Sequence, residues 1–166
     1  MKLSTLSQCL ACAAFAAACA SPFEAPSIAP GTAREQVVAR MGPPTRVVPL
    51  PGGGERFQYS LQPQGRFAWM VDFDTTGRTT RSRQVLTAAG FERILPGQWT
   101  RSDVEREFGP PASIDRVTSW NGPVMTYRWE DVQRAPMFYW IYLDPQGVVQ
   151  RAHPGMEQLD LPDLRI

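Results

Sequence analysis

Few residues in this chain have the types and spacing that catalysis needs. Asp72 and Asp74 are two positions apart in an expected strand, so their side chains share a face and form a candidate carboxylate pair for acid–base work. Asp74 also opens an Asp-x-x-Gly turn, where an aspartate side chain caps backbone N–H groups. His153 is the single histidine, and no Gly-x-Ser-x-Gly elbow supplies a serine for it to activate. We favour structural roles for these residues and expect no catalytic site and no enzyme activity.

The composition argues against most metal, redox and nucleic-acid functions. All three cysteines, Cys9, Cys12 and Cys19, lie within the first 19 of 166 residues, so the rest of the chain has no disulfide framework, CxxC pair or thiolate metal cage. The 17 basic residues nearly balance the 16 acidic ones, so the chain lacks the basic excess that binds phosphate backbones. The glycine cluster at 52–54 lacks the Lys-Ser/Thr of a phosphate loop and is expected to be a hairpin tip. We expect no cofactor, no metal and no nucleic-acid partner.

Residues 1–20 have the plan of an export signal. Lys2 precedes an apolar stretch at 10–18, which is about half the roughly 20 residues that span a bilayer. The alanines before Cys19 resemble a lipobox, which predicts a signal peptide of residues 1–18 and acylation of Cys19. Ala18-Cys19-Ala20 also satisfies the A-x-A rule of the ordinary signal peptidase, so a soluble periplasmic product is the alternative. We favour the lipobox, because acylation removes a thiol that would otherwise be exported unpaired.

The residues after the cleavage site predict a tether and a destination. Three prolines within 19–30 break any helix and favour an extended chain. Ala20 stands where the inner-membrane retention signal of enterobacterial lipoproteins has Asp. We therefore expect a protein anchored to the outer membrane by lipid and facing the periplasm.

An internal repeat is the main structural signal. Residues 30–44 recur at 96–111, and Val37 with its following Gly-Pro-Pro matches Val104 and the second Gly-Pro-Pro at a constant offset of 67. Each copy has the pattern of a short helix with one buried stripe. The glycine that follows is expected to end the helix by adopting a left-handed conformation.

Polar residues at the start of each copy predict helix caps. Thr32 with Glu35, and Thr100 with Asp103, have the spacing of capping boxes. Residues 87–95 predict a further short helix ahead of the second copy.

Period-two patterns follow in both copies and predict strands. They cover 57–61, 67–74, 125–129 and 137–144. The two longer segments each end in an Asp-x-x-Gly turn that leads into a last strand. We predict an α+β fold of two tandem small repeats, each with short helices packed on a three- to four-stranded antiparallel sheet. The first repeat is expected at 31–86, the second at 87–155, and a C-terminal tail at 156–166.

The Gly-x-Pro segments that follow the expected helices, and the order of the elements, resemble the SmpA/OmlA domain of BamE-like outer-membrane lipoproteins. The runs Gly-x5-Val-x3-Met-Gly-x-Pro at 31–44 and Val-x3-Phe-Gly-x-Pro at 104–111 carry the resemblance, which covers residues 30–152 twice over. It implies a non-enzymatic lipoprotein that binds envelope proteins as an accessory of the outer-membrane assembly machinery. The tandem arrangement is similar to that of β-lactamase inhibitor proteins, although those carry disulfides that this body cannot form. That similarity implies the alternative, a periplasmic inhibitor-type protein-binding module.

The second long strand carries the candidate partner-binding residues. Alternation puts Phe138, Trp140 and Tyr142 on the outward face of the second sheet, with Arg128 beside them. Rows of Trp, Tyr and Arg are typical of interface hot spots. The alternative is that the first repeat or the segment 156–166 covers the row. The matching residues of the first copy are also expected to face outward: Ala68, Met70 and Asp72.

Overall fold

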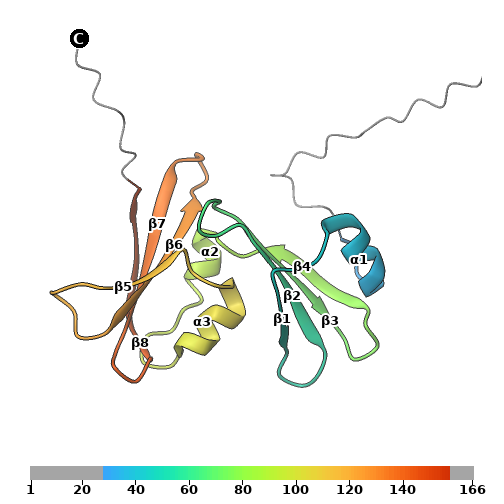
Figure 1. Ribbon diagram of the computed structural model, residues 1–166, viewed down its shortest axis with the longest axis horizontal. Helices are drawn as coiled ribbons and strands as arrows, with labels where there is room; N and C mark the ends of the chain where they lie inside the picture. The colour runs from blue at the N-terminus through green and yellow to red at the C-terminus, as the bar shows by residue number, and fades with distance from the viewer. Residues whose placement is uncertain (1–27, 158–166) are drawn as a thin grey trace, which may run out of the picture.

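The computed structural model describes residues 28–157, which form two four-stranded antiparallel sheets and a few short helices (Figure 1). The fold is therefore mixed α and β, as predicted, with strand as its main component. The expected signal peptide, its lipidation site Cys19 and most of the expected tether and tail lie outside the described residues.

The first half of the described chain is one helix followed by a meander of four strands. Its elements are α1 (Arg34–Met41), β1 (Arg46–Pro49), β2 (Glu55–Ser60), β3 (Ala68–Phe73) and β4 (Thr79–Gln84). Each strand pairs with the next along the chain, in the order β1-β2-β3-β4.

The second half has two helices before a meander of the same order. Its elements are α2 (Ala88–Phe91), α3 (Arg101–Phe108), β5 (Ser113–Arg116), β6 (Pro123–Glu130), β7 (Pro136–Leu143) and β8 (Val149–Met156). The strand order is β5-β6-β7-β8. Strand β8 takes in Met156, the first residue of the expected tail.

Helix α1 begins after a different cap from the one that the sequence suggests. Ala33 is its N-cap residue, and the Gln36 side chain accepts a hydrogen bond from the Ala33 N–H at 3.2 Å. Thr32 instead donates its hydroxyl to the carbonyl of Ala29 at 2.6 Å. The predicted Thr32–Glu35 box is therefore wrong, because Thr32 caps the preceding turn.

Helix α3 begins as predicted. The Thr100 hydroxyl accepts from the Asp103 N–H at 3.3 Å, and the Asp103 carboxylate accepts from the Thr100 N–H at 2.8 Å. Both eight-residue helices end at a glycine with positive φ, Gly42 at 77° and Gly109 at 80°, with ψ of −173° in each. This ψ differs from the expected left-handed value, and the observed region is open almost only to glycine.

Equivalent contacts recur in the two halves. The Tyr59 hydroxyl donates to the Gly42 carbonyl at 3.2 Å, and the Tyr127 hydroxyl donates to the Gly109 carbonyl at 2.7 Å. Each contact ties the end of an eight-residue helix to the second strand of its own sheet. The register between the third and fourth strands also shifts at matching places, after Asp72 in one half and Tyr142 in the other.

The first core lies between α1 and one face of the first sheet. Its buried side chains are Ile28, Val37, Phe57, Tyr59, Trp69, Val71 and Phe73. The predicted alternation is confirmed on this face for Phe57, Tyr59, Trp69, Val71 and Phe73. It is wrong for Leu61, which follows β2 and is 41% exposed.

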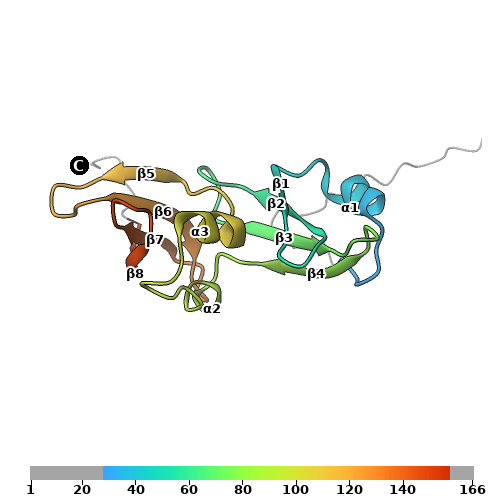
Figure 2. The same cartoon turned by 90° about the horizontal axis from the view of Figure 1, so that it is seen from below.

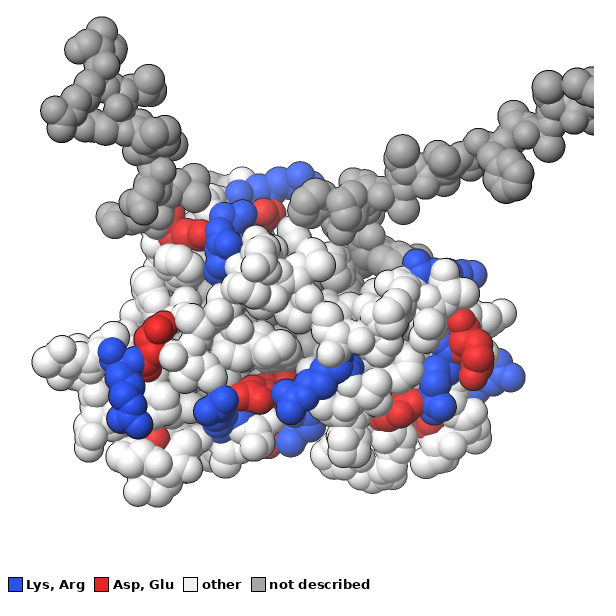
Figure 3. Space-filling model, in the orientation of Figure 1, with Lys and Arg blue, Asp and Glu red and all other residues white. Residues whose placement is uncertain are grey.

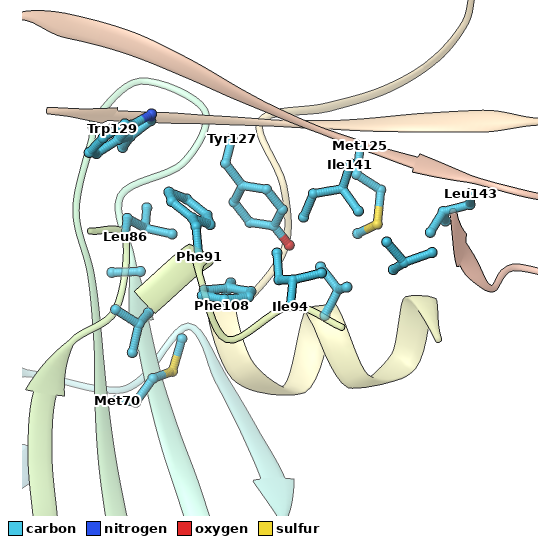
Figure 4. Close-up of a cluster of buried hydrophobic side chains, with 14 residues drawn as sticks. Met70, Leu86, Phe91, Ile94, Phe108, Met125, Tyr127, Trp129, Ile141 and Leu143 are labelled. Atoms are coloured by element: carbon cyan, nitrogen blue, oxygen red, sulfur yellow. The ribbon is translucent and has the colours of Figure 1, made fainter. Parts of the chain in front are cut away.

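The second core joins the two halves. It contains one face of the second sheet, α2 and α3, and it also takes in Ala68 and Met70 from β3 (Figure 4). Helix α3 lies between the two sheets, so the second face of the first sheet is covered (Figure 2). The prediction that Ala68, Met70 and Asp72 face solvent is therefore wrong, because they are 0%, 0% and 8% exposed.

Candidate binding face on the second sheet

The predicted aromatic row lies on the face of the second sheet that is turned away from the second core. Phe138, Trp140 and Tyr142 alternate along β7 with core residues, and each is half-buried. The Phe138 and Trp140 rings are 5.7 Å apart at an interplanar angle of 44°. The β2–β3 loop of the first half reaches one end of the row, where it contacts Arg128, the cross-strand partner of Phe138. The alternative cover, the tail, lies almost wholly outside the described residues.

Neighbouring strands extend the row into a wider patch. Strand β8 places His153 opposite Trp140 and Arg151 opposite Tyr142. The His153 ring centroid lies 5.4 Å from both aromatic centroids, at 57° to Trp140 and 21° to Tyr142. The Arg151 guanidinium lies over the Tyr142 ring at 4.0 Å, which is a cation–π contact.

Trp120, in the β5–β6 connection, closes one end of this patch. Its ring meets Tyr142 edge-on at 5.3 Å, and Arg151 lies 5.7 Å from its centroid. The Trp120 indole N–H donates to the Leu143 carbonyl at 2.7 Å, so the ring is held in place. We call the patch the aromatic face, and its members are Trp120, Phe138, Trp140, Tyr142, Arg151 and His153.

A glycine on β8 sets the orientation of Trp140. A Cβ atom built on Gly155 would lie 2.2 Å from Cζ3 of Trp140, which is well inside van der Waals contact. The indole therefore lies across the backbone at Gly155, the residue paired with Phe138. An aromatic ring that covers a glycine in this way presents a broad apolar surface at low conformational cost.

Arg128 lies at the end of the row but is engaged within the chain. Its guanidinium donates to the carbonyls of Pro63 and Gln64 at 2.9 and 3.3 Å, and it pairs with Glu157. The Gln62 side-chain amide bonds the Arg128 backbone in both directions. Arg128 therefore fastens the β2–β3 loop of the first half to the second sheet.

The candidate carboxylate pair does not form a site. Asp74 accepts from the N–H groups of Thr76 and Arg78 at 2.8 and 2.9 Å, as a turn-capping residue does. Asp72 instead forms ion pairs with Arg56 at 2.5 Å and with Arg83 at 2.9 Å. The structural roles favoured for both aspartates are confirmed.

Asp72 belongs to a buried ion-pair network at the junction of the halves. Arg56 bridges Asp72 to Glu107 of α3 at 2.9 Å, and Glu107 also pairs with Arg83 and Arg93. Burial alone would raise the pKa values of Asp72 and Glu107, but their hydrogen bonds and the charges of the surrounding arginines outweigh it and lower both pKa values. Both carboxylates are therefore ionised partners in the fold.

Other candidate features within the described residues are structural or are not found. Residues 52–54 form the β1–β2 hairpin tip, as predicted. No group of three or more His, Cys, Asp and Glu side chains placed to hold a metal occurs within 28–157. In the same part of the chain, no helix is both long and apolar enough to cross a bilayer. The visible surface carries charges of both signs in small mixed groups (Figure 3).

Comparisons with known proteins assign no family to this chain. No protein-family model matches it, and no curated protein does. Among solved structures, a DUF4309 family protein (YjgB) from Bacillus subtilis is similar over 76% of this chain and 79% of that one. Its identity is 14% and its TM-score is 0.31, so no property of this chain follows from it.

Proposed function

We propose that this chain is a non-enzymatic, exported protein, tethered to the outer membrane through acylated Cys19, that binds other envelope proteins through the aromatic face. The observation that carries the proposal is the partly exposed set of Trp, Tyr, Phe and Arg side chains on the face of the second sheet opposite the second core. Interface hot spots are enriched in Trp, Tyr and Arg. The leader, with its lipobox-like alanines, supports the location.

We also infer that the two halves are tandem copies of one unit of short helices on a four-stranded sheet. Their shared strand order, matching register shifts and equivalent tyrosine-to-glycine hydrogen bonds support the inference. The resemblance to SmpA/OmlA domains then favours an accessory role in outer-membrane protein assembly. The resemblance of the tandem arrangement to β-lactamase inhibitor proteins supplies the second candidate, an inhibitor-type module.

Affinity capture from detergent-solubilised membranes tests the binding proposal. The wild-type chain is expected to retain envelope proteins. Trp140→Ala is expected to reduce their capture at least tenfold, because truncating a hot-spot aromatic costs about 2 kcal/mol or more and about 1.4 kcal/mol is tenfold in affinity. Val47→Ala is the matched control, since Val47 is 48% exposed on β1, far from the aromatic face. Equal capture by a folded Trp140→Ala variant would contradict the proposal. Recovery of the assembly machinery supports the accessory role, and a single stoichiometric enzyme supports the inhibitor role.

Membrane fractionation tests the tether separately. Cys19→Ser removes the acylation site and is expected to move the protein from the membrane fraction to the soluble periplasmic fraction. An unchanged distribution would rule out lipid attachment at Cys19. A wild-type protein that is already soluble would favour cleavage by the ordinary signal peptidase.

A further inference from the structure

The two halves pack together through one face of the first sheet, which binds the end of a helix. The face of the first sheet opposite α1 receives the C-terminal end of α3. We call it the junction face, and its members are Arg56, Gln58, Met70, Asp72 and Arg83. Gln58 donates to the carbonyls of Glu105 and Arg106 at 2.9 and 3.0 Å, and Arg56 donates to the Arg106 carbonyl at 3.0 Å. The Arg106 carbonyl thus has two donors from the first sheet, and the Glu105 carbonyl, which also accepts from the Gly109 N–H at 2.9 Å, gains a further one.

The aromatic face is the counterpart of the junction face on the second sheet. The matched strand registers place Val124, Thr126, Trp140, Tyr142 and His153 where the first sheet has Arg56, Gln58, Met70, Asp72 and Arg83. Four junction-face residues are buried, Arg56, Gln58, Met70 and Asp72, and Arg83 is partly exposed. On the second sheet only Val124 of the five is buried. The part of this face around Trp140 and His153 therefore stays partly exposed, between Trp120 at Tyr142 and the β2–β3 loop at Arg128.

The C-terminal corner of α1 is the counterpart of the part of α3 that docks on the junction face. A Cβ atom built on Gly109 would lie 3.5 Å from Met70 Cε, whereas one built on Gly42 has nothing within 4 Å. Ala39 and Arg40 are exposed, although their counterparts Arg106 and Glu107 are partly buried at the junction. The corner of α1 and the second sheet lie at opposite ends of the molecule (Figures 1 and 2).

The α1 corner and the aromatic face lack the charged residues that meet at the junction. At the junction, Glu105 and Glu107 of α3 face arginines. On α1 the equivalent residues are Val38, which packs against the first core, and Arg40. The positions of Arg56 and Arg83, which pair with Glu107, hold Val124, which is buried, and His153 on the second sheet. At these positions, helix α1 therefore lacks the carboxylates of α3, and the second sheet lacks the arginines that pair with them. Arg40 has no ion pair within residues 28–157, so it is free to lie over an aromatic ring.

We propose that the aromatic face of one copy binds the α1 corner of a second copy, in the pose that the junction face uses for α3. The interaction is head-to-tail, so each copy keeps one free α1 corner and one free aromatic face, and association continues unless a ring closes. The inference rests on the proposed function in that it names a partner for the same surface. Envelope proteins that bind the aromatic face would compete with the second copy.

Disulfide cross-linking in membranes tests this geometry, because the chain has no cysteine after Cys19. Gln58 and Arg106 touch at the junction, and their counterparts are Thr126 and Ala39. A chain that carries both Thr126→Cys and Ala39→Cys is expected to give a reducible ladder of dimers and larger species on mild oxidation. Two populations that each carry one of these substitutions are expected to give only a dimer when mixed, and neither alone is expected to cross-link.

Matched variants separate specific docking from chance collision. Thr126→Cys with Gln146→Cys, a residue at the exposed β7–β8 turn, is expected to give no ladder. Trp140→Ala in the Thr126→Cys and Ala39→Cys chain is expected to remove the ladder, and Arg40→Ala to weaken it severalfold without touching the sheet.

Two results would overturn the inference: no ladder, or efficient cross-linking of either single variant with itself, which would indicate a symmetric contact. If the ladder fails while the Trp140-dependent capture of envelope proteins persists, the proposed function stands and the self-association falls. If capture fails and the ladder forms, the self-association stands and the proposed function falls.

Discussion

The Arg56 side chain connects the two halves of the molecule. It is 4% exposed, and its guanidinium contacts the Asp72 and Glu107 carboxylates and the Arg106 carbonyl. A buried ion pair is weak evidence for net stability, because desolvation offsets much of the Coulombic gain. Removing one partner is different, because the remaining carboxylates stay buried with fewer arginine partners.

Arg56→Ala is therefore expected to lower the free energy of unfolding by about 3–5 kcal/mol. Asp72 would keep Arg83, but Glu107 and the end of α3 would each lose a donor. The exposed Arg81→Ala on the same sheet is the control, with an expected change within about 0.5 kcal/mol. Urea denaturation measures the free energy of unfolding of both variants. Equal, small effects would mean that water solvates the network in the folded state.

At the scale of elements, strands that bury one face could be predicted and strands that bury none could not. The alternation at 57–61 and 137–144 predicts β2 and β7, because apolar side chains on one face must reach a core. Strands β1 and β5 were missed. Their four residues are mostly or wholly exposed edge positions that pair only through the backbone, so they leave no apolar period.

The candidate site was predicted in part for a related reason. Alternation correctly grouped Phe138, Trp140 and Tyr142 on one face, but the partners on β8 depend on the cross-strand register, which one strand does not encode. The same alternation could not show that Met70 is buried, because it tells which residues share a face and not what covers that face. The polar residues that share this face are typical of a solvated surface, and their burial depends on partners from α3.

Strand β8 supports the aromatic face through the absence of a side chain at Gly155. Gly155→Ala is expected to displace the Trp140 indole and to cost about 1–2 kcal/mol, as overpacking does. In a Trp140→Ala background the same substitution is expected to cost almost nothing, because the clash has no second partner. A double-mutant cycle followed by thermal denaturation measures this coupling. Additive effects would show that the indole does not rest on Gly155 in solution.

At the scale of the whole molecule, two contacts between the halves depend on ionised carboxylates. Glu107 joins α3 to the junction face, and Glu157 pairs with Arg66 of the β2–β3 loop as well as with Arg128. Burial would raise the pKa of Glu157, but hydrogen bonds from Arg128 and Arg66 outweigh it and lower the pKa, as the arginines around Glu107 do there. Both contacts are therefore expected to weaken in acid.

The sign follows from the difference between the folded and unfolded pKa values. A carboxylate whose folded pKa lies below its unfolded value of about 4.3 stabilises the fold fully above that value, and this stabilisation is lost as the pH falls through the folded pKa. The free energy of unfolding is expected to decrease steadily from about pH 5 to about pH 3. Glu107→Gln should lower stability at pH 7 and flatten this decrease, whereas Glu35→Gln on the exposed side of α1 should do neither. Urea midpoints at pH 7, 5, 4 and 3 measure the slope. An unchanged slope in Glu107→Gln would mean that the carboxylates of the junction do not govern how the two halves hold together.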